Sequence, residues 1–258
     1  MADIPFSLDE HDERGVKTYL AGFDLFAEKP QEGVQYLNGA FRRFMLTLQM
    51  VPQAANGRSR LLELGANPYF LTLLLKRFRH YELTLANFFG EGHSIDGRGR
   101  QQLSNPFVHE QYDFAYEHFN MEKSPFPYHD HEFDLVLFCE ILEHFVLDAS
   151  YALQEIHRVL KPGGYFLLTT PNVLACQNIV ALMVGRNIYD SYSSNGIYGR
   201  HNREYTPKEV VLLLSACGFE VVTLRVEDIY PHPQLIMRLL KKCRRQWRDN
   251  IFVLARAS

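Results

Sequence analysis

Apolar residues recur every three or four positions in several segments of the chain, which is the spacing of one face of an α-helix. Residues 8–52 form the longest of these segments, and its apolar positions are Val34, Leu37, Phe41, Phe44, Met45 and Leu48. Further helices are predicted over residues 69–79, 141–160, 176–185 and 206–217. The last of these helices begins with Thr206, Pro207 and Glu209, an N-cap threonine, a proline in the first turn and a glutamate that can complete a capping box.

Short apolar runs that are typical of buried strands lie between the predicted helices. They are residues 60–65, 81–86, 114–119, 133–138, 165–170, 219–226 and 251–255. Because strands alternate with helices, we expect an α/β fold with an open, mostly parallel sheet that is covered on both faces. The polar, glycine-containing residues 90–112 are predicted to be an irregular surface insertion, and residues 171–205 a long inserted cap.

Ligands of such sheets bind beyond the carboxyl ends of the strands, so the residues that directly follow strands are the first candidates for a site. Glu63, Gly65, Ala66 and Asn67 end the first strand and open a helix, an arrangement that offers backbone N–H groups to a polar ligand. The dinucleotide pattern GxGxxG and the phosphate pattern GxxxxGK[ST] are both absent. From this segment alone, an ordinary tight turn explains the glycine equally well.

Further segments follow in a characteristic order. They are Phe119-Asn120-Met121-Glu122, Pro125-Phe126-Pro127, Glu132-Phe133-Asp134-Leu135-Val136, Glu140-Ile141-Leu142-Glu143-His144 and Leu160-Lys161-Pro162-Gly163-Gly164. Together with Glu63-x-Gly65, this series resembles the class I S-adenosylmethionine-dependent methyltransferases over roughly residues 55–257. The resemblance implies a Rossmann-like, seven-stranded sheet and S-adenosyl-L-methionine as the cofactor.

The resemblance also implies roles for individual residues. Glu63, Gly65 and Ala66 would face the methionine part of the cofactor, with Asn67 where the family often has a second glycine. Asn87 stands where the family usually has an acid that binds both ribose hydroxyls. The remaining cofactor positions would be Phe88, which could pack on the adenine, Asn120 and Met121 at the adenine edge, and Cys139 and Glu140 at the end of the fourth predicted strand.

A second group of residues suggests the reaction. Glu140, Glu143 and His144 would share one face of a helical turn, where two carboxylates and an imidazole can converge. With His201, which precedes the Tyr205-Thr206 helix start, this element is similar to metal-dependent 2′-O-methyltransferases of small RNA and to ubiquinone-pathway O-methyltransferases. In those families such a set holds a divalent ion, here Mg, Mn, Fe or Zn, that binds the substrate hydroxyl.

Other roles remain open for the same residues. His144 or His201 could act as a general base without a metal, or both could be structural. The acids could also complement the dipole of a helix N-terminus. His129 and His131 flank a predicted surface turn and are expected to be solvated.

Composition restricts the possible partners. The 258 residues carry a formal net charge of −3, which is unlike a basic nucleic-acid-binding protein. Residues 235–248 are the exception, with six cations, no acid and interleaved apolar residues. We expect an amphipathic surface helix with a solvated basic face there, or alternatively a contact with phosphate or a membrane surface.

The cap and the cysteines complete the expectations. The polar and aromatic residues of the cap suit a hydroxylated ligand such as a sugar, although a packed tyrosine-rich loop is equally compatible; they are Asn172, Asn178, Arg186, Tyr189, Tyr192, Asn195, Tyr198, Arg200 and Arg203. Four separated cysteines without a CxxC pair indicate reduced thiols. With no signal-peptide pattern and no membrane-length apolar run, a cytoplasmic protein is expected.

The sequence therefore predicts an N-terminal helical extension (1–55), acting as a lid or as a cover for the sheet, and a methyltransferase domain (56–258). Its expected reaction is O-methylation of a small molecule or glycan, with or without a metal. The alternatives are an RNA 2′-O-methyltransferase, a metal-free N- or C-methyltransferase and a non-catalytic scaffold.

Overall fold

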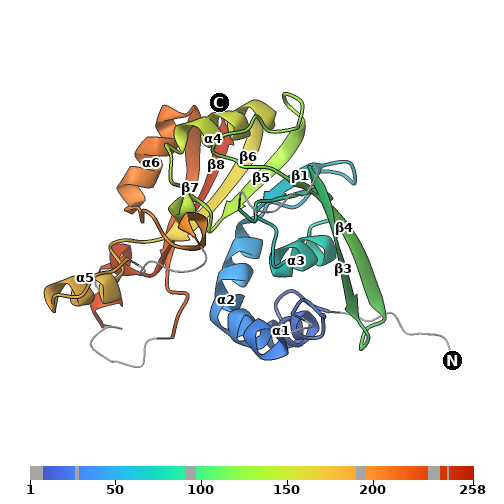
Figure 1. Ribbon diagram of the computed structural model, residues 1–258, viewed down its shortest axis with the longest axis horizontal. Helices are drawn as coiled ribbons and strands as arrows, with labels where there is room; N and C mark the ends of the chain where they lie inside the picture. The colour runs from blue at the N-terminus through green and yellow to red at the C-terminus, as the bar shows by residue number, and fades with distance from the viewer. Residues whose placement is uncertain (1–7, 27–28, 91–96, 190–195, 232–238, 243) are drawn as a thin grey trace.

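A computed structural model describes the chain except for residues 1–7, 27–28, 91–96, 190–195, 232–238 and 243. It contains one eight-stranded sheet in the order β3-β4-β2-β1-β5-β6-β8-β7 (Figure 1). The strands are β1 (Arg60–Leu64), β2 (Glu82–Asn87), β3 (Arg98–Asn105), β4 (Glu110–His118), β5 (Phe133–Cys139), β6 (Leu160–Pro171), β7 (Phe219–Glu227) and β8 (Asn250–Ala257). The five central strands β4, β2, β1, β5 and β6 run parallel, and β3, β8 and β7 pair antiparallel with their neighbours.

Helices cover both faces of the sheet, as predicted. The α-helices are α1 (Glu13–Ala21), α2 (Pro30–Met50), α3 (Phe70–Phe78), α4 (Ser150–Val159), α5 (Cys176–Met183) and α6 (Pro207–Ala216). Side chains of α1, α2 and α3 pack in one hydrophobic core with Leu61 and Leu135, whereas α4 and α6 pack in a second core with Leu62 and Val136. Neighbouring strand residues therefore point to opposite cores, as the two-residue repeat of a strand requires.

The predicted helix 8–52 is two helices, not one. The first ends at its C-cap Gly22, and the second begins with Pro30 at its first helical position. Both contribute to the core beneath the sheet, including the fully buried Val16 and Leu48. The N-terminal extension is therefore packed against the sheet as part of the same core.

The prediction of an irregular insertion over residues 90–112 was wrong for residues 98–105 and 110–112, and residues 91–96 of this range lie outside the described residues. Residues 98–105 and 110–118 form an antiparallel hairpin, and β4 joins the sheet beside β2. The strand β3 is the eighth strand, one more than the sequence predicted. Its side chains are mostly polar because it is an edge strand, where alternate positions face solvent; Leu103 is its buried apolar residue.

Residues 141–160 also differ from the single helix that was predicted. A 3-10 turn, η1 (Leu142–His144), is separated from α4 by a non-helical link. By contrast, the capping box of Thr206 and Glu209 at the start of α6 is confirmed. Cys139, Cys176 and Cys217 are free thiols, and Cys243 lies outside the described residues.

Residues 235–238 and 243 of the basic segment 235–248 lie outside the described residues, and the described remainder is not one solvated amphipathic helix. Residues 239–242 are helical, whereas η3 (Arg245–Trp247) is a separate 3-10 turn. Lys241 is 2% exposed and forms ion pairs with Asp249 and Asp228. Two acids that lie just outside the segment thus neutralise one of the predicted surface cations. Within the described part of the chain, no helix has the length and apolarity needed to cross a membrane.

Candidate functional site

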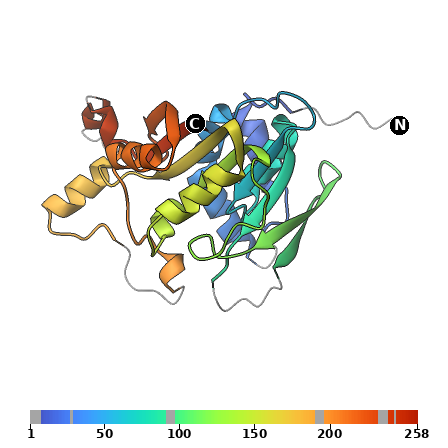
Figure 2. The ribbon, with the colours of Figure 1, turned by 90° about the horizontal axis from the view of Figure 1, so that it is seen from above.

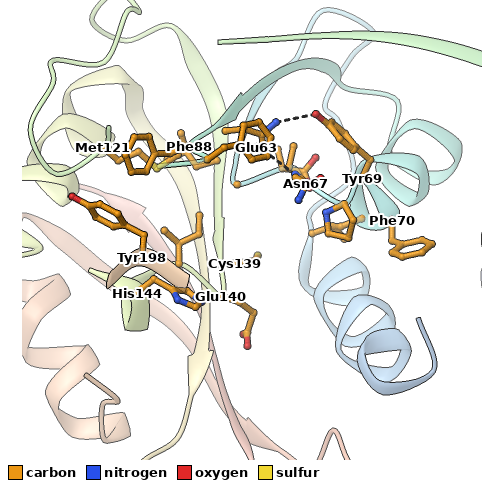
Figure 3. A pocket seen from close by; sticks show the side chains of 18 of the residues that line it. Glu63, Asn67, Tyr69, Phe70, Phe88, Met121, Cys139, Glu140, His144 and Tyr198 are labelled. Atoms are coloured by element: carbon orange, nitrogen blue, oxygen red, sulfur yellow. Dashed lines mark hydrogen bonds between the residues drawn. The ribbon is translucent and has the colours of Figure 1, made fainter. Parts of the chain in front are cut away.

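A pocket lies at the carboxyl ends of β1, β2 and β5 (Figure 3). All of the residues predicted to bind a cofactor line it: Glu63, Gly65, Ala66, Asn67, Asn87, Phe88, Asn120, Met121, Cys139 and Glu140. The sheet order explains this convergence, because β1 lies between β2 and β5 and the three strands run in the same direction. The predicted position of the site therefore follows from the parallel topology.

Gly65 makes the turn from β1 into the pocket. Its φ of +70° lies in the left-handed region that favours glycine, and its N–H donates to the carbonyl of Ala86 at 2.8 Å. A Cβ atom at this position would come within 2.7 Å of the Cδ1 atom of Ile141. The backbone conformation therefore favours glycine at this wall of the pocket, and a larger residue would also displace the end of the Ile141 side chain.

Glu63 places a buried carboxyl beside this turn. The side chain is 3% exposed, and the hydroxyl of Thr72 donates to its Oε2 at 2.6 Å. Burial raises the pKa of Glu63 to about 8, and the hydrogen bond from Thr72 opposes the shift. Among the described residues no cation forms an ion pair with it, so a positively charged ligand group in the pocket would stabilise its ionised form.

Asn87 has a role that the sequence did not indicate. Its Oδ1 accepts the N–H of Asn67 at 2.8 Å, and its Nδ2 donates to the hydroxyl of Tyr69 at 3.0 Å (Figure 3). The amide therefore braces the turn and the start of α3. One amide hydrogen and one lone pair remain for the ribose contact that the resemblance implied, which stays a prediction.

The cap contributes Tyr198 to the opposite wall of the pocket. The ring of Tyr198 meets Phe88 edge to face, with 5.0 Å between centroids, and its hydroxyl accepts a hydrogen bond from Asn120 Nδ2 at 3.2 Å. The sequence placed Tyr198 among the residues of the substrate side. In the structure it packs on Phe88 and Asn120, two of the predicted adenine-side residues.

Helix α2, which belongs to the extension expected to be a lid or a sheet cover, forms a further wall through residues that the sequence did not single out. Tyr36, Arg43, Phe44 and Thr47 from this helix line the pocket. The guanidinium of Arg43 forms a 3.0 Å ion pair with Glu140, although the two residues are 97 positions apart. Only the tertiary packing of α2 reveals this contact, because Arg43 belongs to a polar stripe like that of any surface helix.

Glu140 is bound by residues outside the predicted set of metal ligands. Its Oε2 binds Arg43, and its Oε1 accepts hydrogen bonds from Thr169 Oγ1 at 2.7 Å and Asn250 Nδ2 at 2.8 Å. Its φ of +56° turns the chain out of β5. The expectation that Glu140 joins Glu143 and His144 on one helical face is therefore wrong, because no α-helix forms there. Cys139 beside it lines the pocket as a neutral thiol, since burial raises its pKa to about 12.

Glu143, His144 and His201 do converge. One potential ligand atom from each of these residues lies within 4.8 Å of the others. The backbone carbonyls of Glu143 and His144 hold the segment of His201 in place. Asn202 N donates to the carbonyl of Glu143 at 2.7 Å, and Asn202 Nδ2 donates to the carbonyl of His144 at 2.9 Å. We call these three residues the Glu-His-His cluster. His144 also lines the pocket, so the cluster adjoins the predicted cofactor site.

The hydrogen bonds orient both imidazoles of the cluster. His144 Nδ1 lies 2.9 Å from the carbonyl oxygen of Arg200, and His201 Nδ1 lies 3.1 Å from Glu204 Oε1. A carbonyl and a carboxylate only accept hydrogen bonds, so each Nδ1 carries a proton, and a ring in its neutral form has its lone pair on Nε2. Histidines that bind metals are commonly oriented by acceptors of these two kinds.

Glu143 is fully buried and has one oxygen without a partner. Its Oε2 accepts from Thr170 Oγ1 at 2.9 Å, whereas no donor among the described residues reaches Oε1. Burial, and then the charge of Glu140, raises the pKa of Glu143. An unpartnered carboxylate oxygen beside two oriented imidazoles fits a divalent cation, which would satisfy the lone pair. His129 and His131 are exposed at a surface turn, as expected.

Comparisons with known proteins agree with the pocket. Residues 62–168 match a methyltransferase domain family. A probable S-adenosylmethionine-dependent methyltransferase of Mycolicibacterium smegmatis is 32% identical over 104 residues, which cover 40% of this chain and 34% of that protein. A mitochondrial arginine hydroxylase of Danio rerio is 29% identical over 127 residues, or 45% of this chain and 36% of the relative. The chain thus spans about a third of the length of these curated relatives.

Solved structures support the fold. The methyltransferase in a complex with the Trm112 activator of Haloferax volcanii aligns with a TM-score of 0.57 and 13% identity, over 94% of this chain and 97% of that one. The matched domain contains the carboxyl end of β1, the Gly65 turn and the strand β5, which carry the pocket. The methyltransferase domain over residues 62–168 and the similar fold support the resemblance to the class I S-adenosylmethionine-dependent methyltransferases.

Proposed function

We propose that this protein transfers a methyl group from S-adenosyl-L-methionine to a hydroxyl of a small molecule or glycan, assisted by a divalent ion that the Glu-His-His cluster holds. The observation that carries the proposal is the convergence of Glu143, His144 and His201 next to a pocket lined by every predicted cofactor residue.

Several side chains of the pocket suit the cofactor. The buried Glu63 carboxylate can pair with the ammonium group of the methionine part, and Gly65 allows close backbone approach. Phe88 and Met121 offer apolar surfaces for the adenine, with Asn120 at its edge. Bound S-adenosyl-L-methionine supplies an electrophilic methyl group on its sulfonium.

The cluster suits the acceptor half of the reaction. An alcohol is a weak nucleophile at neutral pH. A divalent ion such as Mg, Mn, Fe or Zn would lower the pKa of a hydroxyl that it binds. Glu143, His144 and His201 would provide one oxygen and two nitrogen ligands, which leaves further positions for the acceptor. Since His144 also lines the pocket, an acceptor hydroxyl held there would face the cofactor.

Elemental analysis of purified protein after incubation with divalent metal ions tests the ligand set. We expect bound metal in the wild type and its loss in His201→Ala and Glu143→Gln. His131→Ala, which changes an exposed histidine, is the matched control and should retain the metal. Glu140→Gln should also retain it, because Glu140 is bound to Arg43. Full retention in either cluster variant would refute the metal site.

The other functions predict different results. A metal-free base at His144 or His201 predicts methyl transfer that a chelator does not inhibit. An RNA 2′-O-methyltransferase predicts RNA binding that weakens steeply with salt. The ion pairs of Lys241 with Asp228 and Asp249 count against RNA binding, because they neutralise one cation of the basic segment. A scaffold predicts no binding of millimolar S-adenosyl-L-methionine.

Hydroxylation is a second candidate. Two histidines and one carboxylate are also the ligand set of non-haem iron oxygenases, and the relative from Danio rerio is named a hydroxylase. Oxygen consumption by the ferrous protein with a reductant, in the absence of S-adenosyl-L-methionine, would favour this reaction over methyl transfer.

A further inference from the structure

The helix α5 carries an exposed apolar end. It projects from the body of the protein beside the segment that precedes β8, and both views show the two next to each other (Figure 1, Figure 2). Consecutive or neighbouring apolar side chains at its end are solvent-exposed: Val180 (41%), Leu182 (56%), Met183 (80%) and Val184 (64%). Grouped exposure of this kind marks an interaction surface more often than scattered apolar residues do.

The neighbouring segment extends this surface. Leu239 and Leu240 are also exposed, at 53% and 37%. The two segments are joined at their bases, where Gln177 Nε2 donates to Asp249 Oδ1 at 3.0 Å and Asn172 Nδ2 donates to the carbonyl of Gln246 at 2.8 Å. We call the exposed apolar residues of both segments the α5 surface.

Cations accompany the α5 surface. Arg186 follows the end of α5, and Lys242, Arg244 and Arg245 follow Leu240; all four are exposed. None of the four forms an ion pair with another described residue, in contrast to Lys241, which is neutralised by Asp249 and Asp228. Exposed aliphatic side chains among cations complement a membrane surface that carries negative charge.

We propose that the α5 surface binds the surface of an anionic lipid bilayer, with the aliphatic side chains entering the interface and the cations at the headgroups. The aliphatic residues favour a bilayer over RNA, since phosphate contacts need only the cations. The helix α5 follows the carboxyl end of β6, the same edge of the sheet as the pocket. Docking would therefore bring that edge near the membrane. The proposal does not depend on the reaction that the pocket performs.

Flotation with vesicles tests this proposal on the full chain. We expect the wild type to float with vesicles of phosphatidylcholine and phosphatidylglycerol, to remain unbound with phosphatidylcholine alone, and to be released by salt. Trp247, the single tryptophan of the chain, lies next to the cations, so its fluorescence should change on binding. Replacement of Lys242, Arg244 or Arg245 by glutamine should weaken vesicle binding roughly fivefold for each cation removed.

Leu182→Ser with Met183→Ser tests the apolar part, and it should abolish flotation because both side chains are exposed and leave the core intact. Phe107→Ser is the matched control. Phe107 is 84% exposed in the turn between the outermost strand β3 and its neighbour β4. Unchanged flotation of the double variant would overturn the proposal. Binding of RNA by a wild type that does not bind vesicles would also overturn it. The same holds if the wild type does not float but forms a dimer that the double variant converts to a monomer.

Discussion

Replacing Glu63 by glutamine should make the free protein more stable near neutral pH while weakening cofactor binding. The carboxyl is buried, and its pKa rises from 4.5 to about 8 on folding. Between these two values the folded state binds more protons at this residue than the unfolded state does. Stability therefore falls as the pH rises from 4.5 towards 8.

The magnitude follows from the shift. One pKa unit corresponds to about 1.4 kcal/mol, so the loss accumulated by pH 7 is about 3 kcal/mol. Glutamine cannot ionise and escapes this loss, although its amide still needs hydrogen-bond partners. We expect Glu63→Gln to raise the free energy of unfolding at pH 8 by about 1–3 kcal/mol and to remove most of the decline between pH 5 and 8.

Urea denaturation at pH 5 and pH 8 measures the first effect, and calorimetric titration with S-adenosyl-L-methionine measures the second. Binding should weaken at least tenfold, or about 1.4 kcal/mol, because the variant lacks the charge that pairs with the ammonium. Glu82→Gln, on the exposed start of β2, is the matched control and should change neither quantity. A Glu63→Gln protein with unchanged pH dependence, or with unchanged affinity, would refute the reasoning.

Three further substitutions have defined expectations. Gly65→Ala should destabilise the protein by about 1–3 kcal/mol in thermal denaturation and weaken cofactor binding, whereas Gly163→Ala, also at a positive φ but in open space, should affect stability alone. Thr206→Ala should lower the free energy of unfolding by about 1 kcal/mol through loss of the capping box, and no change in urea denaturation would contradict this role. Lys241→Met should cost about 3–5 kcal/mol because it removes the cation that neutralises the buried Asp249 carboxylate, while the same change at the adjacent exposed lysine should be nearly neutral in the same assay.

Much of the sheet was predictable because its central strands are buried on both faces. Runs such as 133–138 are apolar except for Asp134, and their alternation with helices already indicates a parallel sheet. The hairpin of β3 and β4 was not predictable in this way. Many of its residues are polar because they face solvent at the edge of the sheet, so the sequence shows no apolar run there. The strands become apparent only because β4 pairs with β2 and β3 pairs with β4.

The residues predicted for the cofactor side came from the family resemblance, and all of them line the pocket, at or just after the ends of strands. That they bind the cofactor stays a prediction. The reaction side was predicted in part. Glu143, His144 and His201 come together, but Glu140 does not, because η1 is a single 3-10 turn and Arg43 draws the carboxylate towards α2. A contact across 97 residues from a helix with an ordinary polar face leaves no local signal in the sequence.

A crystal structure of the protein with S-adenosylhomocysteine and Mn²⁺ tests the proposed function most directly. The account predicts the ligand in the pocket beside Glu63 and Gly65, and one anomalous peak bound by Glu143, His144 and His201 on the side that the sulfur faces. A filled pocket with no metal at these three residues, or a metal there with the ligand bound elsewhere, would contradict it.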